Sequence, residues 1–347
     1  MATGTHNSVW RITGRTVRGA SHHRSGLPNQ DAIGWLQRAG SSPWSIVAVS
    51  DGHGSAKYFR SHVGSQLAID TSLALVQEFI KGQPDINNLS LIKRTAEDRL
   101  PREMSRRWRE AVEKHIEDHP FSEEELAALE GSDGTAAREA ITKNPVHAYG
   151  ATILTVLVQE SFILYFQLGD GDILLVSDAG EVERPLSKDE RLFANETTSL
   201  SSRDAWPDFR LSFQTLAGPP PALILLSTDG YANSFVSEEA FLKVGKDLLE
   251  MIRAEGLDKV EANLEGWLTE ASQAGSGDDI TLALIGRADA LRGEAVNSSA
   301  EEVPATTEET ASNLPASSGE TSDMPAQPPA ESAPDAQQAL TAGEEKP

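Results

Sequence analysis

Aspartate side chains stand at the ends of apolar stretches in several parts of the chain. The runs "VAVSDG" and "LILLSTDG" each end in a small hydroxyl residue followed by Asp-Gly, at Asp51 and Asp229. Other acids lie next to the apolar residues of "PNQDAIGW", "FQLGDGD" and "SGDDITLALI", namely Asp31, Asp170, Asp278 and Asp279. A single Asp-Gly pair is an ordinary turn signal, since Gly accepts a positive φ and Asp can bond its own backbone. Repetition of the pattern indicates a shared site instead.

Carboxylates gathered at one sheet edge would repel one another, and a bound cation is the simplest way to offset that repulsion. The chain has no cysteine, so the ligands would be oxygen or imidazole groups, which favours Mg²⁺ or Mn²⁺. Gly52, after Asp51, would let a backbone carbonyl approach such an ion. Two ions that share one carboxylate would activate a water molecule and suit hydrolysis of a phosphate ester. The alternative is that each acid serves only a turn.

The elements that would position these acids occur in blocks. Short apolar runs predict strands at 44–50, within 150–182, and at 222–230 and 276–286. Helical spacing predicts helices at 61–82, at 90–119 with an interruption at Pro101, at 121–131 with Ser122 as N-cap, and at 239–256 and 259–275. Tight turns are expected at 159–161, 169–171 and 178–180. Blocks without strict strand–helix alternation favour antiparallel sheets with helices packed outside, a layered α+β domain.

Charge and composition exclude several classes of protein. From Glu294 onward, 11 acids and one lysine give a charge of −10, and the preceding residues hold the remaining −13 of the total of −23. Because both parts are acidic, a nucleic-acid-binding surface is disfavoured. With no signal-peptide core and no apolar run near 20 residues, we expect a cytoplasmic protein without membrane association. The Pro-, Ala-, Ser-, Thr- and Glu-rich residues 293–347 are expected to form a disordered tail after a domain of residues 1–292.

Six stretches, in order, resemble the metal-dependent protein phosphatases of the PPM or type 2C family in its bacterial form. They are "PNQDA", "VAVSDGHGS", "GATIL", "LGDGDILL", "LLSTDG" and "SGDDITLAL", and they cover the chain from about residue 15 to residue 286. The resemblance implies a two-layer antiparallel β-sandwich flanked by helices, in the order α-β-β-α. It also implies a centre of two Mg²⁺ or Mn²⁺ ions at one edge, with a possible third ion.

The resemblance also implies roles for individual residues. Asp51 resembles the carboxylate that bridges both ions, with the Gly52 carbonyl on one of them, and Asp229 and Asp278 resemble the other direct ligands. Asp279 stands where the family often has Asn, so it ranks below Asp278. Asp170 resembles the acid of a third, weaker metal site. The acid that orients metal-bound water corresponds to Asp31.

Two further residues would act on the substrate. His53 stands where the family has a general acid, and an ordinary histidine pKa of about 6.5 would suit proton donation near neutrality. Arg24 is a candidate for binding the phosphate, because a guanidinium fork matches phosphate oxygens. The alternatives are a turn histidine exposed to water and a surface arginine. This chain departs from the family at Gln30, commonly Glu, and at Asp172, often Arg, which puts the tuning of the metal centre in doubt.

The sequence therefore predicts a protein serine/threonine phosphatase that hydrolyses phosphoserine and phosphothreonine. It is expected to be a monomer that acts on phosphorylated proteins and is paired with a Ser/Thr kinase. Residues 186–209 are expected to form a variable flap beside the site. Three alternatives remain open: a catalytically silent module that binds phosphorylated partners, a scaffold that works through its acidic tail, and a phosphatase of small phosphate esters.

Overall fold

The computed structural model describes residues 10–40, 42–188 and 198–292, which belong to one unit of the chain, Met1–Glu294. Ten strands in this part form two five-stranded antiparallel sheets. In spatial order, the first sheet contains β1 (Trp10–Val17), β10 (Ile280–Arg287), β9 (Leu223–Ser227), β6 (Asp172–Val176) and β7 (Val182–Glu183). The second contains β2 (Ala32–Arg38), β3 (Trp44–Ser50), β4 (Ile153–Gln159), β5 (Phe162–Leu168) and β8 (Arg210–Thr215).

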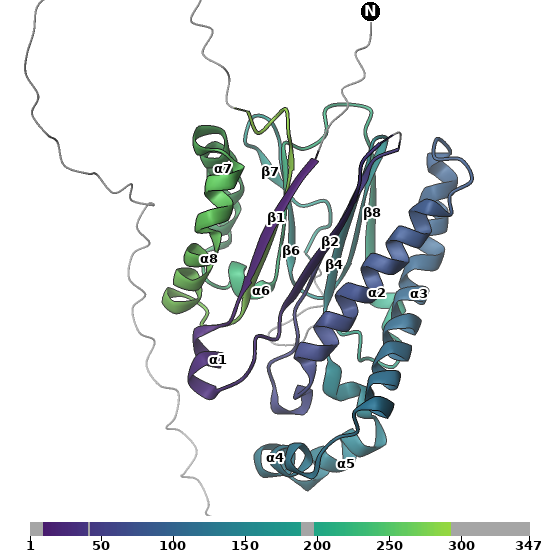
Figure 1. Ribbon diagram of the computed structural model, residues 1–347, viewed down its shortest axis with the longest axis vertical. Coiled ribbons are helices and arrows are strands. Elements are labelled where there is room, and N and C mark those ends of the chain that lie inside the picture. The colour runs from purple at the N-terminus through teal and green to yellow at the C-terminus, as the bar shows by residue number, and fades with distance from the viewer. Residues whose placement is uncertain (1–9, 41, 189–197, 293–347) are drawn as a thin grey trace, which may run out of the picture. The chain divides into compact units, whose positions relative to one another are not determined.

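Helices cover the outer face of each sheet, as Figure 1 shows. Helices α2 (Ser61–Lys81) and α3 (Leu89–Asp118) lie against the second sheet, and α7 (Glu238–Glu255) and α8 (Leu257–Ala274) lie against the first. Shorter helices are α1 (Ala20–Ser25), α4 (Glu123–Asp133), α5 (Thr135–Lys143) and α6 (Asp229–Ala232). The predicted four-layer α-β-β-α arrangement is confirmed. Among the described helices, none is both long and apolar enough to cross a membrane.

The strands are apolar on both faces because each sheet lies between two layers. Along β3, Ile46 packs toward the helices α2 and α3, while the next residue, Val47, packs between the sheets. Along β9, Leu225 packs toward α7 and α8, while Leu226 packs between the sheets. Since successive strand side chains point to opposite faces, these continuous apolar runs build three stacked cores rather than one.

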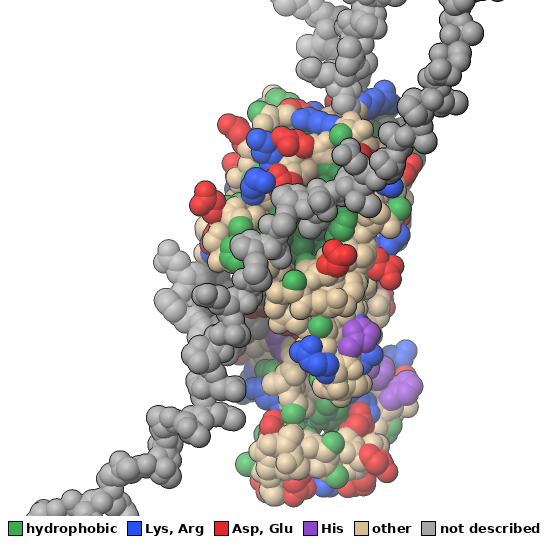
Figure 2. All heavy atoms as spheres, turned by 90° about the vertical axis from the view of Figure 1, so that its left-hand side faces the viewer, with side chains coloured by type: hydrophobic (Ala, Val, Ile, Leu, Met, Phe, Trp, Pro, Cys, Tyr) green, Lys and Arg blue, Asp and Glu red, His purple; other side chains and the backbone are tan. Residues whose placement is uncertain are grey.

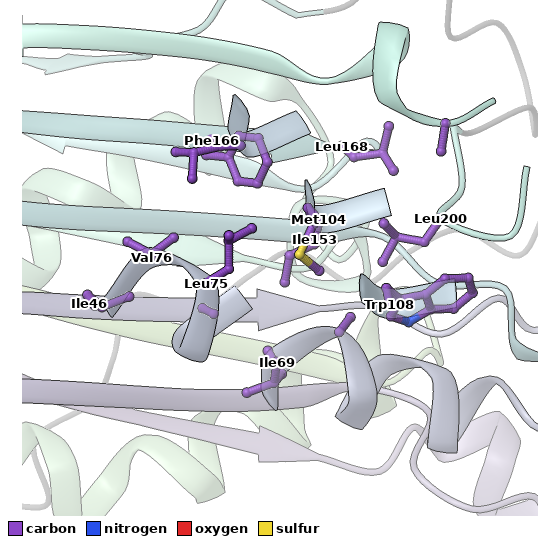
Figure 3. Close-up of a cluster of buried hydrophobic side chains, with 14 of the residues drawn as sticks. Ile46, Ile69, Leu75, Val76, Met104, Trp108, Ile153, Phe166, Leu168 and Leu200 are labelled. Atoms are coloured by element: carbon purple, nitrogen blue, oxygen red, sulfur yellow. The ribbon is translucent and has the colours of Figure 1, made fainter. Parts of the chain in front are cut away.

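The core under α2 and α3 explains why α3 does not break at Pro101. Figure 3 shows side chains of α2, α3 and the second sheet meeting in this core, among them Ile69, Met104 and Phe166. The predicted interruption is wrong, because α3 runs without a break from Leu89 to Asp118. Pro101 cannot donate the usual backbone hydrogen bond. The burial of Met104 and Trp108, which continue the apolar face after Pro101, holds the helix together across that gap.

The other predicted helix boundaries agree with the structure. The helix α2 ends at Lys81 with Gly82 as its C-cap, as its spacing indicated. Ser122 caps α4 in a full capping box, in which its hydroxyl accepts from the N–H of Glu125 and the Glu125 carboxylate accepts from the N–H of Ser122. These local signals need no tertiary contact, which is why the sequence alone located them.

The turn at residues 169–171 joins strands of different sheets. The sequence predicted a tight turn there, and Gly169 has a φ of 109°, which favours glycine. The strands that it connects do not pair with each other, since β5 belongs to the second sheet and β6 to the first. The turn therefore carries Asp170 across the sandwich edge, toward the ends of β3 and β9.

Candidate active site

Three aspartates converge at this edge of the sandwich. Asp51 follows β3, Asp170 lies in the turn between β5 and β6, and Asp229 begins α6 after β9. Each offers one carboxylate oxygen, and these three oxygens lie within 4.8 Å of one another. The structure thus brings together residues that are 119 and 59 positions apart in sequence, from both sheets.

The cluster carries negative charge at a partly open edge, where Asp51 and Asp229 are half-buried and Asp170 is exposed. Burial raises the pKa of Asp51 well above its ordinary value, and the neighbouring Asp229 raises it further. Burial also raises the pKa of Asp229 to about 6, with Asp170 as the next cause. Oxygen donors that repel one another in this way suit a hard divalent cation, which would stabilise all three in their charged form. The donor set fits Mg²⁺ or Mn²⁺.

Asp278 and Asp31 lie around this cluster rather than in it. Asp278 precedes β10 and is not one of the three converging acids, although its charge contributes to the raised pKa of Asp229. Asp31 is buried, and its Oδ2 accepts hydrogen bonds of 2.8 Å from the hydroxyls of Thr228 and Thr281. Burial raises the pKa of Asp31 well above its ordinary value, and the charge of Asp279 adds to this.

Asp279 has a structural set of contacts. Its Oδ1 accepts from the backbone N–H of Gly19 and its Oδ2 from that of Gln30, both at 2.6 Å. The Nδ1 of His22 lies 2.9 Å from the same Oδ1. Both oxygens are therefore engaged by the segment that precedes β2. These contacts agree with ranking Asp279 below Asp278 as a ligand, and the sequence did not indicate them.

Glycines let the backbone pass closely beside two of the acids. A Cβ atom at Gly52 would lie 2.6 Å from the carbonyl oxygen of Gln30. At Gly230, directly after Asp229, a Cβ atom would lie 2.1 Å from the carbonyl oxygen of Asp279. Both distances are far below van der Waals contact with backbone that cannot move aside. The glycine of each Asp-Gly pair is thus required by tertiary packing as well as by any turn.

The sequence match assigns the family. Residues 18–269 match the model of the family described as protein phosphatase 2C. The chain belongs to the protein phosphatase 2C family. As a member, it is a protein serine/threonine phosphatase. No curated protein sequence matches the chain.

Solved phosphatase structures share the fold of this protein phosphatase 2C member. A bacterial serine phosphatase is 16% identical with a TM-score of 0.51, over 80% of this chain and 98% of the other. The serine/threonine phosphatase Stp1 from Staphylococcus aureus is also 16% identical with a TM-score of 0.51, over 80% and 95% of the two chains. At this level of identity the likeness shows the fold.

His53 follows Asp51 by two residues and is half-buried. Its backbone N–H donates to the carbonyl of Gly150 at 3.1 Å. Its ring packs against the ring of Tyr58, with 4.7 Å between the two ring centroids. Burial lowers the pKa of His53 to about 4, and the nearby His147 adds to this. The ordinary pKa assumed from the sequence therefore does not apply, and neither does the alternative of an exposed turn histidine.

Arg24 lies beside the turn that precedes β10. It is an exposed residue of α1, a helix that is tied to the turn before β10. The backbone N–H and the hydroxyl of Ser21 both donate to the carbonyl of Gly277, at 2.8 and 2.5 Å. These contacts hold α1 against Gly277, the residue before Asp278, and a Cβ atom at Gly277 would lie 4.0 Å from Nη2 of Arg24.

The departure at Asp172 has its own partner. Asp172 begins β6 and accepts a hydrogen bond of 2.5 Å from the Nε of Arg184, a residue that the sequence analysis missed. The pairing of residues 172 and 184 could be suspected only once β6 and β7 were known to be neighbours. Of the predicted flap, residues 189–197 lie outside the described residues of this phosphatase.

Proposed function

We propose that this phosphatase works through two divalent cations, Mg²⁺ or Mn²⁺, at the converging carboxylates. Asp51 would bridge the ions, with Asp229, Asp278 and the Gly52 carbonyl as further ligands, and Asp170 would serve a third, weaker site. The observation that carries the proposal is the approach of Asp51, Asp170 and Asp229 to within 4.8 Å, with their oxygens as the only donor type. The raised pKa values of Asp51 and Asp229 support it, because their repulsion destabilises the metal-free protein and would be offset by bound cations.

The cations, when bound, would lower the pKa of a water molecule and make it a nucleophile for the phosphoryl group. The residues of the chain then have separate tasks. Asp31, held by two threonine hydroxyls, would orient that water from behind the ligands. Arg24 would bind the phosphoryl oxygens. The leaving serine or threonine oxygen would then face His53.

His53 would donate a proton to the leaving serine or threonine oxygen. With a pKa of about 4 it is neutral near pH 7, and the arrival of a phosphate dianion beside the ring would favour its protonated form. We therefore expect His53→Gln to lower kcat for a phosphothreonine peptide by about 100-fold, the usual size of general-acid catalysis. The loss should be much smaller for p-nitrophenyl phosphate, whose phenolate departs without a proton. Equal losses on both substrates would contradict this role.

The function itself is tested by metal-dependent turnover. Protein stripped of metal with a chelator is expected to release no phosphate from a phosphothreonine peptide. Addition of Mn²⁺ or Mg²⁺ should restore the release. Binding of the metal, measured by calorimetry, should occur over the same concentrations. If metal binds and no substrate is turned over, the protein is instead a module that binds phosphorylated partners. If no metal binds, the proposed centre is refuted.

The wider setting of the enzyme is also part of the proposal. Residues 1–292 would form the phosphatase domain, and residues 293–347 an acidic tail that lies outside the described residues. The enzyme would act as a cytoplasmic monomer on phosphoproteins, opposite a Ser/Thr kinase. Removal of the residues after 292 distinguishes the enzyme from a scaffold that works through its acidic tail. The enzyme would keep its turnover without these residues, whereas the scaffold would lose its partner.

A further inference from the structure

A pocket of about 170 Å³ opens beside the carboxylate cluster and shares Asp170 with it. It lies where strands of both sheets meet, between the end of β5 and the start of β6 on one side and the start of β8 on the other. Three cationic side chains line it, Arg184, Lys188 and Arg210. This volume holds several water molecules, or one carboxylate or phosphate group.

The wall of the pocket that carries Asp170 is fixed in place. The side-chain amide of Gln167 donates to the carbonyl of Gly171 at 2.7 Å and to that of Gly169 at 3.2 Å. Gln167 is itself buried and lies opposite Arg210 in the pairing of β5 with β8. The pocket and the cluster are therefore held at a set separation, with Asp170 between them.

Arg184 supplies a hydrogen-bond donor that has no acceptor. Its Nε donates to Asp172 at 2.5 Å and its Nη1 to Glu238 at 2.6 Å, while its side chain is 13% exposed. Its Nη2 is buried and has no hydrogen-bond partner within the described part of the chain. Buried polar groups are nearly always paired, so an unpaired guanidinium N–H on a residue that lines a pocket points to a missing ligand oxygen.

The charge of the pocket favours an anionic ligand once cations are bound. Arg184 and Lys188 share the acid Glu238, with Lys188 Nζ at 3.0 Å from it. Asp172 is engaged by Arg184, and the charge of Asp170 would be offset by the cations of the proposed centre. With these acids engaged or offset, an anionic oxygen is the acceptor that the guanidinium of Arg184 would bind most strongly.

We infer that this pocket binds an anionic side chain of the phosphoprotein substrate, either a carboxylate or a second phosphate group. The inference rests on the proposed function. Because the pocket shares Asp170 with the cluster, the anionic residue must lie close in sequence to the phosphorylated one. An extended chain advances about 3.3 Å per residue, so a spacing of one or two residues is expected.

Phosphothreonine peptides that differ at one flanking position test this. Peptides with Gln, Glu or phosphoserine at each position within two residues of the phosphothreonine would be compared by kcat/KM. At the position that reaches the pocket, we expect the anionic peptides to exceed the Gln peptide by about 10-fold, as a charge-assisted hydrogen bond allows. A preference for Glu assigns a carboxylate, and a preference for phosphoserine assigns a second phosphate. Equal rates for all peptides would overturn the inference.

Variants of the pocket make the test specific. Two variants should each reduce the ratio of kcat/KM for the anionic peptide to that for the Gln peptide toward one. The first is Lys188→Gln, at an exposed position, and the second is Arg184→Gln combined with Asp172→Asn, which leaves no buried acid unpaired. Lys243→Gln is the matched control, because this exposed lysine lies on α7, on the side of the molecule seen in Figure 2, and does not line the pocket. It should leave the ratio unchanged.

Binding separates failure of the pocket from failure of the proposed function. If no peptide is hydrolysed, binding to the pocket can still be measured. Fluorescence anisotropy would report the binding of labelled peptides that carry a non-hydrolysable phosphonate in place of the phosphothreonine. Tighter binding of the anionic peptide, lost in Lys188→Gln, would support the pocket and leave the proposed catalysis refuted. Equal binding of the anionic and Gln peptides would refute the pocket.

Discussion

Asp229→Asn is expected to abolish phosphatase turnover and yet to raise the melting temperature of the metal-free protein. The change removes a proposed ligand, and metal centres contribute several kcal/mol to the transition state, so a loss of more than about 100-fold is expected. Stability moves the other way, because burial raises the pKa of Asp229 from 3.8 to about 6. Keeping this group ionised at high pH costs about 3 kcal/mol, which Asn does not incur.

The same shift fixes the pH dependence of the metal-free wild type. A carboxyl with a raised pKa in the folded state stabilises the fold below its unfolded pKa, and this contribution is lost as the pH rises through the folded pKa. For Asp229 the loss runs from near pH 4 to beyond pH 6. The pKa values of Asp31 and Asp51 are raised as well, so the decline in stability continues at higher pH. Added Mn²⁺ should reverse it.

Thermal unfolding in chelator, from pH 4 to pH 8, measures both effects. The difference in melting temperature between Asp229→Asn and wild type should grow with pH across this range. Asp258→Asn is the control, because this side chain is 84% exposed, pairs with Arg11 and is not one of the converging acids. It should alter neither turnover nor the pH profile. A variant at Asp229 that is less stable than wild type at pH 8 would contradict the repulsion described above.

Arg60→Met is expected to destabilise the protein strongly, because Arg60 links the site loop to the helical end of the molecule. Its guanidinium is buried and bonds both oxygens of Glu125, at 2.7 and 2.8 Å. It also donates to the hydroxyl of Tyr149 at 2.8 Å and to the carbonyl of His119 at 2.5 Å. Because Glu125 is 31% exposed, water compensates part of its lost pairing, and we expect removal of the buried guanidinium to cost about 2 kcal/mol.

Arg60→Met should also loosen the loop of residues 51–60, which contains His53. The backbone N–H of Arg60 donates to Ala148 and that of His53 to Gly150, so residues 51–60 lie along the same segment that Arg60 fixes through Tyr149. Denaturant unfolding measures the change in free energy, with Arg106→Met as control. Arg106 also pairs with two glutamates, but it is 52% exposed, and its loss should cost less than about 1 kcal/mol. Equal costs for the two variants would refute the role given to Arg60.

Local patterns located the long helices and the central strands, but they did not predict the strands β1, β2, β7 and β8 or the short helices α1, α5 and α6. Continuous apolar runs indicated strands buried on both faces, and the Ser122 capping box and the glycine after Lys81 located helix ends without any tertiary contact. Pro101 shows the limit of such signals. The burial of Met104 and Trp108 outweighs the missing backbone hydrogen bond, and no local rule contains that burial.

For the site, the sequence alone determined that acids stand at strand ends, that their ligand type is oxygen, and that six motifs occur in the order of the type 2C phosphatases. Only the tertiary structure decided which acids meet. It groups Asp51, Asp170 and Asp229, places Asp278 outside that trio, and turns Asp279 toward backbone N–H groups. It also lowers the pKa of His53. The reason is that side-chain alternation is a local property, whereas strand partners, desolvation and charge contacts depend on residues far apart in the chain.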